Sequence, residues 1–347
     1  MKIINTAIIG FGLSGRVFHA PFIHEHPGFQ LSKVVERHRK DAQAIYHGIE
    51  TIRSFEEILA DESIELVVIC TPNIYHYSMA KASLEAGKDI VIEKPFMPNS
   101  AKADEIIKLA EKKERNIFVY QNRRWDGDFL SLKKLLNQGT LGEIKYFESH
   151  FDRFSPIRTR AAWRDEVLAG SGILFDLGSH LIDQAYALFG SPLTIKANIQ
   201  AQRKGSKVDD FFHIRMRYSS HEVVVTAGML VKDHQLRFII KGSKGSYTKN
   251  GLDPQETELN KGNLPKGKDW GKESSENWGT LILDDNKQLQ HSKLETEAGD
   301  YMAFYQNVYE VIAHKKELAI KLSDASNVIK IIEKAFESNA KKKEIKF

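Results

Sequence analysis

The tripeptide Glu93-Lys94-Pro95 places two opposite charges directly after the apolar run Ile90–Ile92. Proline restricts the residue before it to extended geometry, so it fixes the direction of Lys94. An ammonium group at the end of a buried strand is costly unless its charge is used, and it can polarise a carbonyl group or stabilise an alkoxide. Lys94 is therefore a candidate catalytic residue, and Glu93 could pair with it or with a ribose hydroxyl. The alternative is a surface loop.

Asp176 and His180 are spaced so that they lie one turn apart on one face of a predicted helix over 172–189, and Asp183 continues that stripe. A carboxylate beside an imidazole orients the ring and makes it more basic, so His180 is a candidate proton acceptor and Asp176 its partner. An isolated pair of this kind is more often a polar pair on a solvated face or a satisfied core histidine. The preceding Gly170-Ser171-Gly172 favours the catalytic interpretation, because glycine lets a ligand approach the helix start.

The segment Gly10–Gly15 follows the apolar run Ala7–Ile9 and has the glycine spacing of a dinucleotide-binding turn. The first glycine permits a tight turn, the second lets the backbone approach a pyrophosphate, and the third lets the next helix pack closely on the sheet. Glu36 closes the second apolar run about 20 residues further on, where a carboxylate can accept ribose hydroxyls. A plain structural turn is the alternative. The predicted cofactor contacts here are Gly10, Phe11, Gly12, Leu13, Ser14, Gly15, Glu36 and Arg37.

A second group of cofactor contacts is predicted at later strand ends. Thr71, Pro72 and Asn73 follow the run Leu66–Cys70, with His76 three residues beyond Asn73. A turn at this edge of a parallel sheet lies beside the dinucleotide, although Asn73 could equally be the N-cap of a helix. Glu93, Lys94 and Gln121 complete the predicted cofactor site.

Arginines and aromatic residues gather in the connecting segments after residue 121. Such residues can line a pocket for hydroxyl-rich or anionic ligands, and for most of them interdomain salt bridges and packing are the better interpretation. The predicted substrate contacts are Arg123, Trp125, Arg153 and Trp163. No metal site is predicted.

Apolar runs and helical patterns alternate up to residue 121, which predicts a doubly wound parallel sheet, the Rossmann fold. Its strands are expected at 6–9, 31–35, 51–52, 66–70, 90–92 and 117–120. The remainder, with helices at 129–136 and 172–189 and period-two runs from 193 to 241, predicts an α+β domain with a large open, mostly antiparallel sheet. Residues 250–277 are expected to form a long loop, and helices at 299–314 and 323–341 to close the chain. The predicted domains are 1–121 and 122–347.

The composition of the 347 residues, with a net charge of +4, describes an ordinary globular protein. The lysines are scattered, so a nucleic-acid surface is not expected. No apolar stretch has the ~20 residues of a membrane helix and there is no signal-peptide core, so we expect a cytoplasmic protein. The single cysteine, Cys70, lies inside an apolar run and is interpreted as a buried core residue.

Four motifs, in this order and spacing, resemble the glucose-fructose oxidoreductase / inositol dehydrogenase / rhizopine catabolism (Gfo/Idh/MocA) family: Gly10–Gly15, Thr71–His76, Glu93–Pro95 and Asp176–Asp183. The resemblance covers essentially the whole chain. Three segments look most like the scyllo-inositol dehydrogenase branch of that family: Gln121–Phe129, Phe151–Phe154 and Asp176–Gln184.

The resemblance implies that Lys94 assists at the reacting oxygen, while Asp176 and His180 handle substrate hydroxyls and the proton. We therefore expect an NAD(P)-dependent oxidoreductase acting on a secondary alcohol of a cyclic polyol or sugar, with the ammonium and the imidazole converging over the nicotinamide. A homodimer or homotetramer through the C-terminal sheet is also implied. A redox-assisted glycosidase and a non-catalytic dinucleotide-binding regulator are the alternatives, and retention of Lys94, Asp176 and His180 argues against the regulator.

The cofactor expected from the sequence is NAD. Branch members that use the phosphorylated cofactor tend to show Ser-Arg where this chain has Glu36-Arg37, and a carboxylate there repels a 2′-phosphate. Arg37 and Arg39 are close enough to compensate a phosphate, so NADP stays open.

Overall fold

The computed structural model describes residues 1–157, 167–168, 170–233, 235–285 and 288–347. The chain forms two compact units, each assembled from three segments. The first unit comprises Met1–Trp125, Pro254–Trp270 and Asp300–Ser326. The second comprises Asp126–Asp253, Gly271–Gly299 and Asn327–Phe347. Among the described residues, no helix is long and apolar enough to cross a membrane.

The first unit contains a parallel sheet of six strands in the order β3-β2-β1-β4-β5-β6. The inner strand β4 is wholly apolar and buried, as a parallel strand covered on both faces must be. This arrangement confirms the predicted Rossmann sheet. The strands are β1 (Ile4–Ile9), β2 (Phe29–Val35), β3 (Glu50–Ile52), β4 (Leu66–Ile69), β5 (Asp89–Glu93) and β6 (Ile117–Tyr120).

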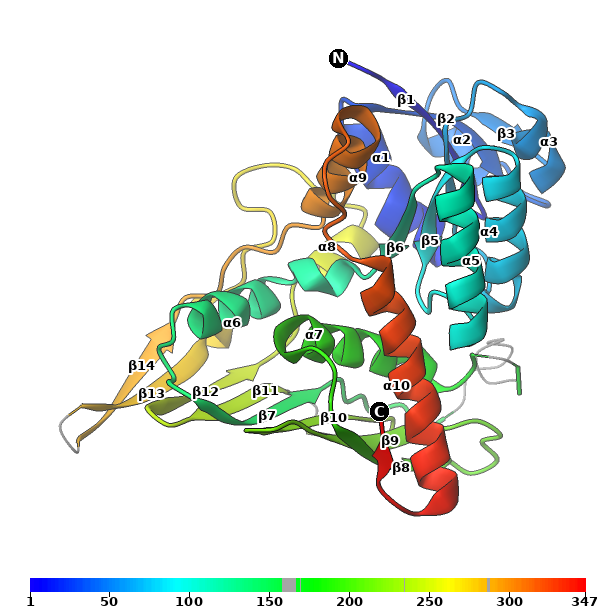
Figure 1. Cartoon of the computed structure of the whole chain (residues 1–347). Coiled ribbons are helices and arrows are strands. Elements are labelled where there is room, and N and C mark those ends of the chain that lie inside the picture. Colours follow the sequence, from blue (N-terminus) through cyan, green and yellow to red (C-terminus); the bar gives the residue numbers. More distant parts are fainter. Residues whose placement is uncertain (158–166, 169, 234, 286–287) are drawn as a thin grey trace. The chain divides into compact units, whose positions relative to one another are not determined.

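Helices cover both faces of this sheet (Figure 1). One face packs against α3 (Phe55–Ala60), α4 (His76–Glu85) and α5 (Ser100–Lys113). The other packs against a π-helical turn η1, α1, α2 and α9. These elements are η1 (Ser14–His19), α1 (Ala20–Glu25), α2 (Asp41–Ile45) and α9 (Met302–His314). The short elements η2 (Asn73–Tyr75), η3 (Asn122–Trp125) and α8 (Gln255–Asn260) complete the unit, together with the first residues of α10 (Leu322–Lys341).

Three helix ends carry residues typical of helix termini. Ser54 and Glu57 make a capping box at the start of α3, because each side chain accepts a hydrogen bond from the other residue's backbone N–H. Asn99 caps α5 by accepting a hydrogen bond from the backbone N–H of Lys102 at 2.9 Å. Gly87, with φ of +74°, follows the end of α4.

The second unit contains a sheet of nine strands in the order β14-β13-β12-β11-β7-β10-β9-β8-β15. Every neighbouring pair is antiparallel except β10 and β7. This confirms the predicted α+β domain with a large, mostly antiparallel sheet. The strands are β7 (Ile144–His150), β8 (Thr194–Gln200), β9 (Phe211–Arg217), β10 (Glu222–Gly228), β11 (Leu236–Gly242), β12 (Gly245–Asn250), β13 (Gly279–Asp285), β14 (Gln288–Leu294) and β15 (Ile345–Lys346).

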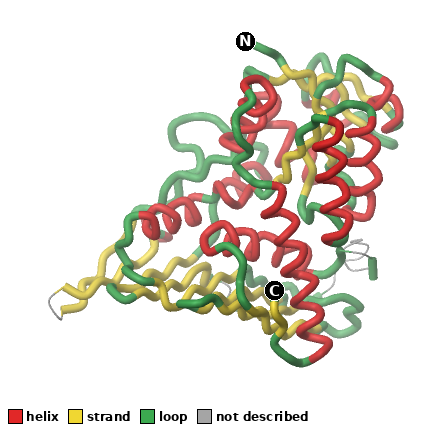
Figure 2. The backbone as a smooth tube through the Cα atoms, in the orientation of Figure 1, coloured by secondary structure: helices red, strands yellow, loops and turns green. Residues whose placement is uncertain are grey.

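Three helices pack on one face of this sheet and bury its largest apolar cluster. They are α6 (Gly127–Asn137), α7 (Ser179–Phe189) and the second part of α10, and Figure 2 shows them on the same side of the strands. A π-helical turn, η5 (Leu174–Gly178), leads directly into α7, so the helix predicted over 172–189 has a wider first turn.

In the later part of the chain one prediction is wrong and one pair of strands was missed. The expected loop at 250–277 contains α8 and the turn η6 (Ser275–Asn277), which are too short and polar to show helical periodicity. The paired strands β13 and β14 were not predicted either. Six of the seven residues of β14 are exposed, so this strand lacks the alternation between buried and exposed positions that reveals a strand in a sequence.

Candidate active site

The carboxyl ends of the first unit's strands form the edge that carries most of the predicted cofactor residues. Because the strands are parallel, the segments after β1, β4, β5 and β6 all leave the sheet on this edge. The strand order reverses its direction between β1 and β4, which is the position where sheets of this kind bind nucleotides.

The glycine turn after β1 has backbone geometry that requires glycine at two of its three motif positions. Gly10 has φ of +93°, and a Cβ atom at Gly15 would lie 2.3 Å from the Gly10 carbonyl oxygen, so neither position accepts a side chain without distortion. A Cβ atom at Gly12 would meet nothing within 4 Å among the described residues. The backbone is therefore open at Gly12, the glycine predicted to face a pyrophosphate.

Gln121 supplies a second observation that fits a dinucleotide. Its side chain, at the end of β6, is 2% exposed. Its Oε1 atom is buried and accepts no hydrogen bond from the residues that the structure describes. A buried acceptor left in this state is costly, so a donor such as the nicotinamide amide would satisfy it. The residues present therefore fit a nicotinamide dinucleotide.

Glu36 lies at the predicted position after β2, but its carboxylate is used by the chain itself. It is 6% exposed. Oε1 accepts a hydrogen bond from the backbone N–H of Asp41 at 3.0 Å, and Oε2 accepts one from Ala42 at 3.1 Å. Glu36 thus holds the start of α2, while Arg37, like the rest of the segment 37–40, is exposed.

The segment after β4 is held by His76 rather than by the predicted cap. Asn73 is the first residue of η2 and Pro72 occupies the N-cap position, so the interpretation of Asn73 as an N-cap is wrong. His76 is buried, with Nδ1 3.0 Å from the carbonyl oxygen of Pro95 and Nε2 3.1 Å from that of Thr71. Burial lowers the pKa of His76. This ring therefore joins Thr71 to the residue that follows Lys94.

The Glu-Lys-Pro motif contacts the glycine turn directly. The Ser14 hydroxyl, in η1, donates a hydrogen bond to Oε1 of Glu93, and the backbone N–H of Lys94 donates to Oε2 at 3.1 Å. Burial acts to raise the pKa of Glu93, but hydrogen bonds from His19 and Ser14 and the charge of Lys94 outweigh it, so the pKa is lowered. The Lys94–Pro95 peptide bond is cis. Sequence reasoning missed His19, which lies within 3.0 Å of Glu93.

In the second unit, Asp176 lies in η5 and His180 in the first turn of α7. Asp176 is partly exposed, and His180 is 6% exposed. The start of η5 is anchored by Asp209, because the backbone N–H of Leu174 donates to its Oδ2 at 2.7 Å. Gly172 is required here, since a Cβ atom would lie 1.9 Å from Oδ1 of Asp209.

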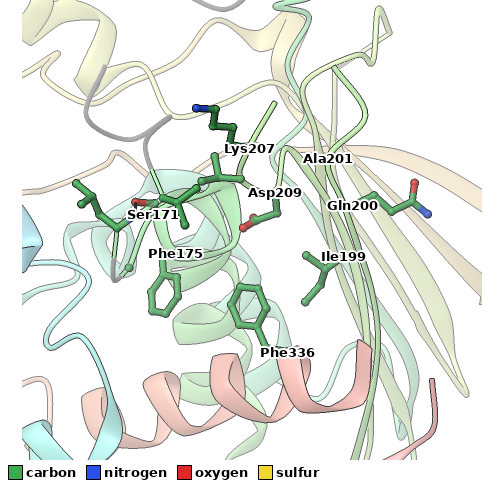
Figure 3. A pocket seen from close by; sticks show the side chains of 12 residues that line it. Ser171, Phe175, Ile199, Gln200, Ala201, Lys207, Asp209 and Phe336 are labelled. Atoms are coloured by element: carbon green, nitrogen blue, oxygen red, sulfur yellow. Dashed lines mark hydrogen bonds between the residues drawn. The ribbon is translucent and has the colours of Figure 1, made fainter. Parts of the chain in front are cut away.

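A cavity of about 380 Å³ opens beside this anchor. Figure 3 shows Asp209 between Lys207 and the rings of Phe175 and Phe336. Burial raises the pKa of Asp209 to about 6. The cavity therefore combines apolar walls with a carboxylate that titrates close to neutral pH.

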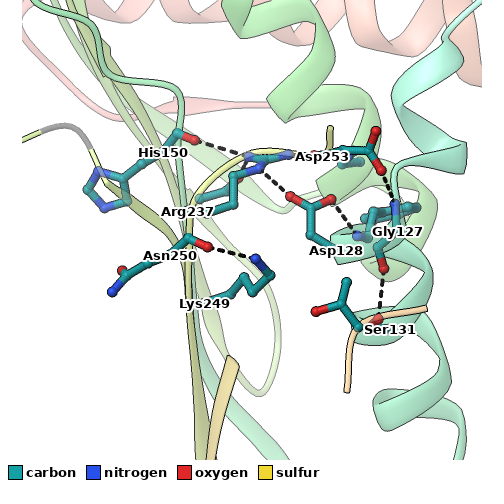
Figure 4. Close-up of polar contacts among 12 residues, drawn as sticks. Gly127, Asp128, Ser131, His150, Arg237, Lys249, Asn250 and Asp253 are labelled. Carbon is teal, nitrogen blue, oxygen red and sulfur yellow. Dashed lines mark hydrogen bonds and ion pairs between the residues drawn. The ribbon is translucent and has the colours of Figure 1, made fainter. Parts of the chain in front are cut away.

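A fully buried arginine contacts α7 through the side chain of Gln184. Arg237, in β11, donates from Nε to Oδ2 of Asp128 at 2.9 Å and from Nη2 to Oε1 of Gln184 at 2.7 Å. It also donates from Nη1 to the Ser149 hydroxyl and to the carbonyl oxygen of His150, both at 3.0 Å. Figure 4 shows the contacts of Arg237 with His150 and Asp128. Gln184 lies one turn beyond His180. This network was not predicted, although a charged residue inside the apolar run at 236–240 was a usable signal.

The predicted substrate contacts have different environments. Arg123 is buried and forms an ion pair with Glu256, within the first unit. The Trp125 ring packs edge-on against Phe304 at 5.7 Å between centroids. Arg153 is exposed and lies 5.3 Å from the centroid of the Phe151 ring. Trp163 lies outside the described residues.

Two family models match this chain. Residues 4–121 match the NAD-binding Rossmann fold of the Gfo/Idh/MocA oxidoreductase family, and residues 133–347 match the C-terminal alpha/beta domain of the same family. The chain belongs to the Gfo/Idh/MocA oxidoreductases. The resemblance drawn from the four motifs is thus confirmed, and NAD(P) is the cofactor of this family's N-terminal domain.

Full-length relatives within the family agree with this assignment. The chain is 38% identical to the uncharacterized oxidoreductase YdgJ of Escherichia coli, over 96% of each chain. It is 34% identical to the scyllo-inositol 2-dehydrogenase (NADP(+)) IolW of Bacillus subtilis, over 99% of this chain and 95% of the relative. Among solved structures, the oxidoreductase YvaA of Bacillus subtilis is similar with a TM-score of 0.97 and 34% identity, covering 100% of this chain and 99% of that one.

Proposed function

We propose that the protein is an NAD(P)-dependent dehydrogenase that oxidises a secondary alcohol of a cyclic polyol or sugar. The observation that carries this proposal is the hydrogen bond from Ser14, in the helix of the glycine turn, to Glu93, the neighbour of Lys94. It ties the residue next to Lys94 to the glycine turn that is proposed to hold the nucleotide. Oxidation of an alcohol develops negative charge on its oxygen, and a fixed ammonium stabilises that charge.

The roles proposed for the chain's residues follow from their chemistry. When bound, the nicotinamide ring accepts the hydride from the alcohol carbon. Lys94 stabilises the developing alkoxide, His180 takes the hydroxyl proton, and Asp176 orients the substrate. The predicted contacts Arg123, Trp125, Arg153 and Trp163 are retained as proposed substrate residues. An inositol-like substrate is supported by the 34% identity to a relative named as a scyllo-inositol dehydrogenase.

Both NAD and NADP are proposed as cofactors. The carboxylate of Glu36 accepts backbone hydrogen bonds from α2, so it is held away from a 2′-phosphate that it would otherwise repel. Arg53 fixes the following loop by donating to the carbonyl oxygens of Glu36 and Arg39 at 2.6 and 2.7 Å. The exposed cations at 37–40 are available to a phosphate.

A homo-oligomer through the nine-stranded sheet is also proposed, as the family resemblance implies. Alternate residues of β9, His213, Arg215 and Arg217, are exposed while their neighbours belong to the core. Light scattering on the purified protein would measure the mass of the assembly.

The function is tested by offering the purified protein a panel of inositol isomers and aldoses with NAD or NADP, and following reduced nicotinamide by its ultraviolet absorbance. Net reduction with at least one polyol is expected. Glycosidic cleavage without net reduction would replace the proposal with the redox-assisted glycosidase. Nucleotide binding with no turnover on any substrate would favour a regulator.

A further inference from the structure

Three buried side chains form a hydrogen-bonded chain behind the Glu-Lys-Pro motif in the first unit. His19, at the end of η1, is fully buried, and its Nε2 atom lies 3.0 Å from Oε1 of Glu93. Its Nδ1 atom lies 2.6 Å from the hydroxyl of Tyr305, a fully buried residue of α9. Neither His19 nor Tyr305 has a role in the chemistry proposed above.

One assignment of protons satisfies all of these contacts. If the ring proton of His19 is on Nε2, that nitrogen donates to Glu93 and Nδ1 accepts from the Tyr305 hydroxyl. Ser14 also donates to Oε1 of Glu93, and the Lys94 backbone N–H donates to Oε2. The carboxylate therefore accepts three hydrogen bonds, which offsets the cost of burying its charge.

Among the described residues, this row of hydrogen bonds does not extend beyond the Tyr305 hydroxyl. Tyr305 is fully buried, and burial raises the pKa of its hydroxyl well above the ordinary value, so it keeps its proton. Its ring stacks on Phe22 at 6.1 Å, and the His19 ring lies 4.2 Å from that of Tyr120, so both are held firmly. Because His19 and Tyr305 are buried and fixed by packing, their hydrogen bonds serve to hold Glu93 in position.

We infer that His19 and Tyr305 are positioning residues: acting through Glu93, they fix the counter-charge and the backbone of Lys94 beside the glycine turn. The consequence for catalysis rests on the proposed function of Lys94, whereas the hydrogen-bond chain itself does not. Loss of either residue should lower turnover more than it lowers nucleotide affinity, because the glycine turn keeps its own geometry.

The first test measures the hydrogen bonds of His19 without any substrate. In the full-length protein labelled with ¹⁵N-histidine, NMR should show that Nε2 of His19 carries a proton, its signals assigned by their loss in His19→Asn. Tyr305→Phe should shift the Nδ1 signal, and Glu93→Gln the Nε2 signal. Tyr309→Phe is the matched control, since Tyr309 lies one turn further along α9 and its hydroxyl donates to the carbonyl oxygen of Lys2 at 3.2 Å. An Nδ1–H tautomer, or an Nδ1 signal that does not change in Tyr305→Phe, would overturn the inference.

The second test measures turnover and nucleotide affinity in the same variants. We expect kcat to fall about fivefold in Tyr305→Phe and about a hundredfold in Glu93→Gln, with Kd for the reduced nucleotide changed by less than about twofold. His19→Gln keeps a donor near the position of Nε2 and should retain more activity than His19→Asn. A parallel loss of turnover, nucleotide affinity and melting temperature would indicate a merely structural role. If the unmodified protein turns over no polyol, the proposed function fails, and the NMR measurement still decides whether the chain exists.

Discussion

Gly15 lies so close to Gly10 that a Cβ atom built on it would come within 2.3 Å of the Gly10 carbonyl oxygen. Gly15→Ala should therefore move the backbone of the turn and lower the free energy of unfolding by about 1–3 kcal/mol, as overpacked sites do. Urea denaturation followed by circular dichroism measures this. Stability within about 0.5 kcal/mol of the unmodified protein would show that the turn yields without strain.

Gly12→Ala tests the same turn for binding rather than stability. Because a Cβ atom there meets nothing within 4 Å among the described residues, folding should be almost unaffected. A methyl group at the point of closest approach to the pyrophosphate should weaken nucleotide binding at least about tenfold. Fluorescence titration with the reduced nucleotide measures this change, and a melting temperature equal to that of the unmodified protein checks that Gly12→Ala folds normally. Unchanged affinity in Gly12→Ala would place the pyrophosphate elsewhere.

Lys94→Ala should slow the chemical step about 10²- to 10⁴-fold while changing nucleotide affinity less than about threefold. The reason is that the ammonium acts on the substrate oxygen, whereas the nucleotide is held by the glycine turn. Single-turnover kinetics and nucleotide titration separate the two effects. Lys102→Ala, which removes a partly exposed lysine of α5 paired with Glu105 at 2.9 Å, is the control. Turnover of Lys94→Ala within a few-fold of the unmodified protein would remove this lysine from the mechanism.

Features of this structure that are formed by residues close together in the sequence could be predicted, whereas contacts between distant residues could not. The strand predicted at 66–70 was recognisable because its residues are apolar, and it forms as the buried strand β4. The strand β14 was missed because six of its seven residues are exposed. The glycine turn and the Glu-Lys-Pro motif can be recognised in the sequence because their residues lie within a few positions of one another. The contact between His19 and Tyr305 cannot be recognised in this way, because the two residues are 286 positions apart and nothing in the sequence around Tyr305 distinguishes it from the other tyrosines.

His180→Gln should lower kcat about 10²- to 10³-fold, because glutamine cannot take up the hydroxyl proton. Its measurement is the rate of nicotinamide reduction at saturating polyol. His213→Gln, which changes an exposed histidine of β9 in the same unit, should leave the rate unchanged. Equal rates in both variants would assign proton uptake to another group.

The loop after β2 should respond to substitution in a way that depends on the cofactor. Replacing both Arg37 and Arg39 by alanine should weaken NADPH binding about tenfold and leave NADH binding within about twofold, since only NADPH carries the 2′-phosphate. Glu36→Gln should change the affinity for either nucleotide little, because its carboxylate faces the backbone of α2. A large loss of NADH affinity in Glu36→Gln would instead show that Glu36 turns to hold the ribose.

Asp209 should make the second unit less stable as pH rises from 4 to 6. Its pKa in the folded protein is raised from 3.8 to about 6 by burial, so the folded state binds this proton more tightly than the unfolded state does. Its stabilising contribution is therefore complete below pH 3.8, is lost as the pH rises through about 6, and does not change further at higher pH.

The matched variant is Asp209→Asn, which keeps an oxygen to accept the Leu174 N–H but does not titrate. Between pH 4 and 7 the unfolding free energy of the unmodified protein should fall by about 1–2 kcal/mol relative to this variant, as urea denaturation at each pH would show. Lys207 and the Asp210–Arg203 pair lie near Asp209 and remain in both proteins, so their effects cancel. Parallel stability curves would mean that the carboxylate is ionised throughout this range, and that η5 starts on a charged anchor at every pH.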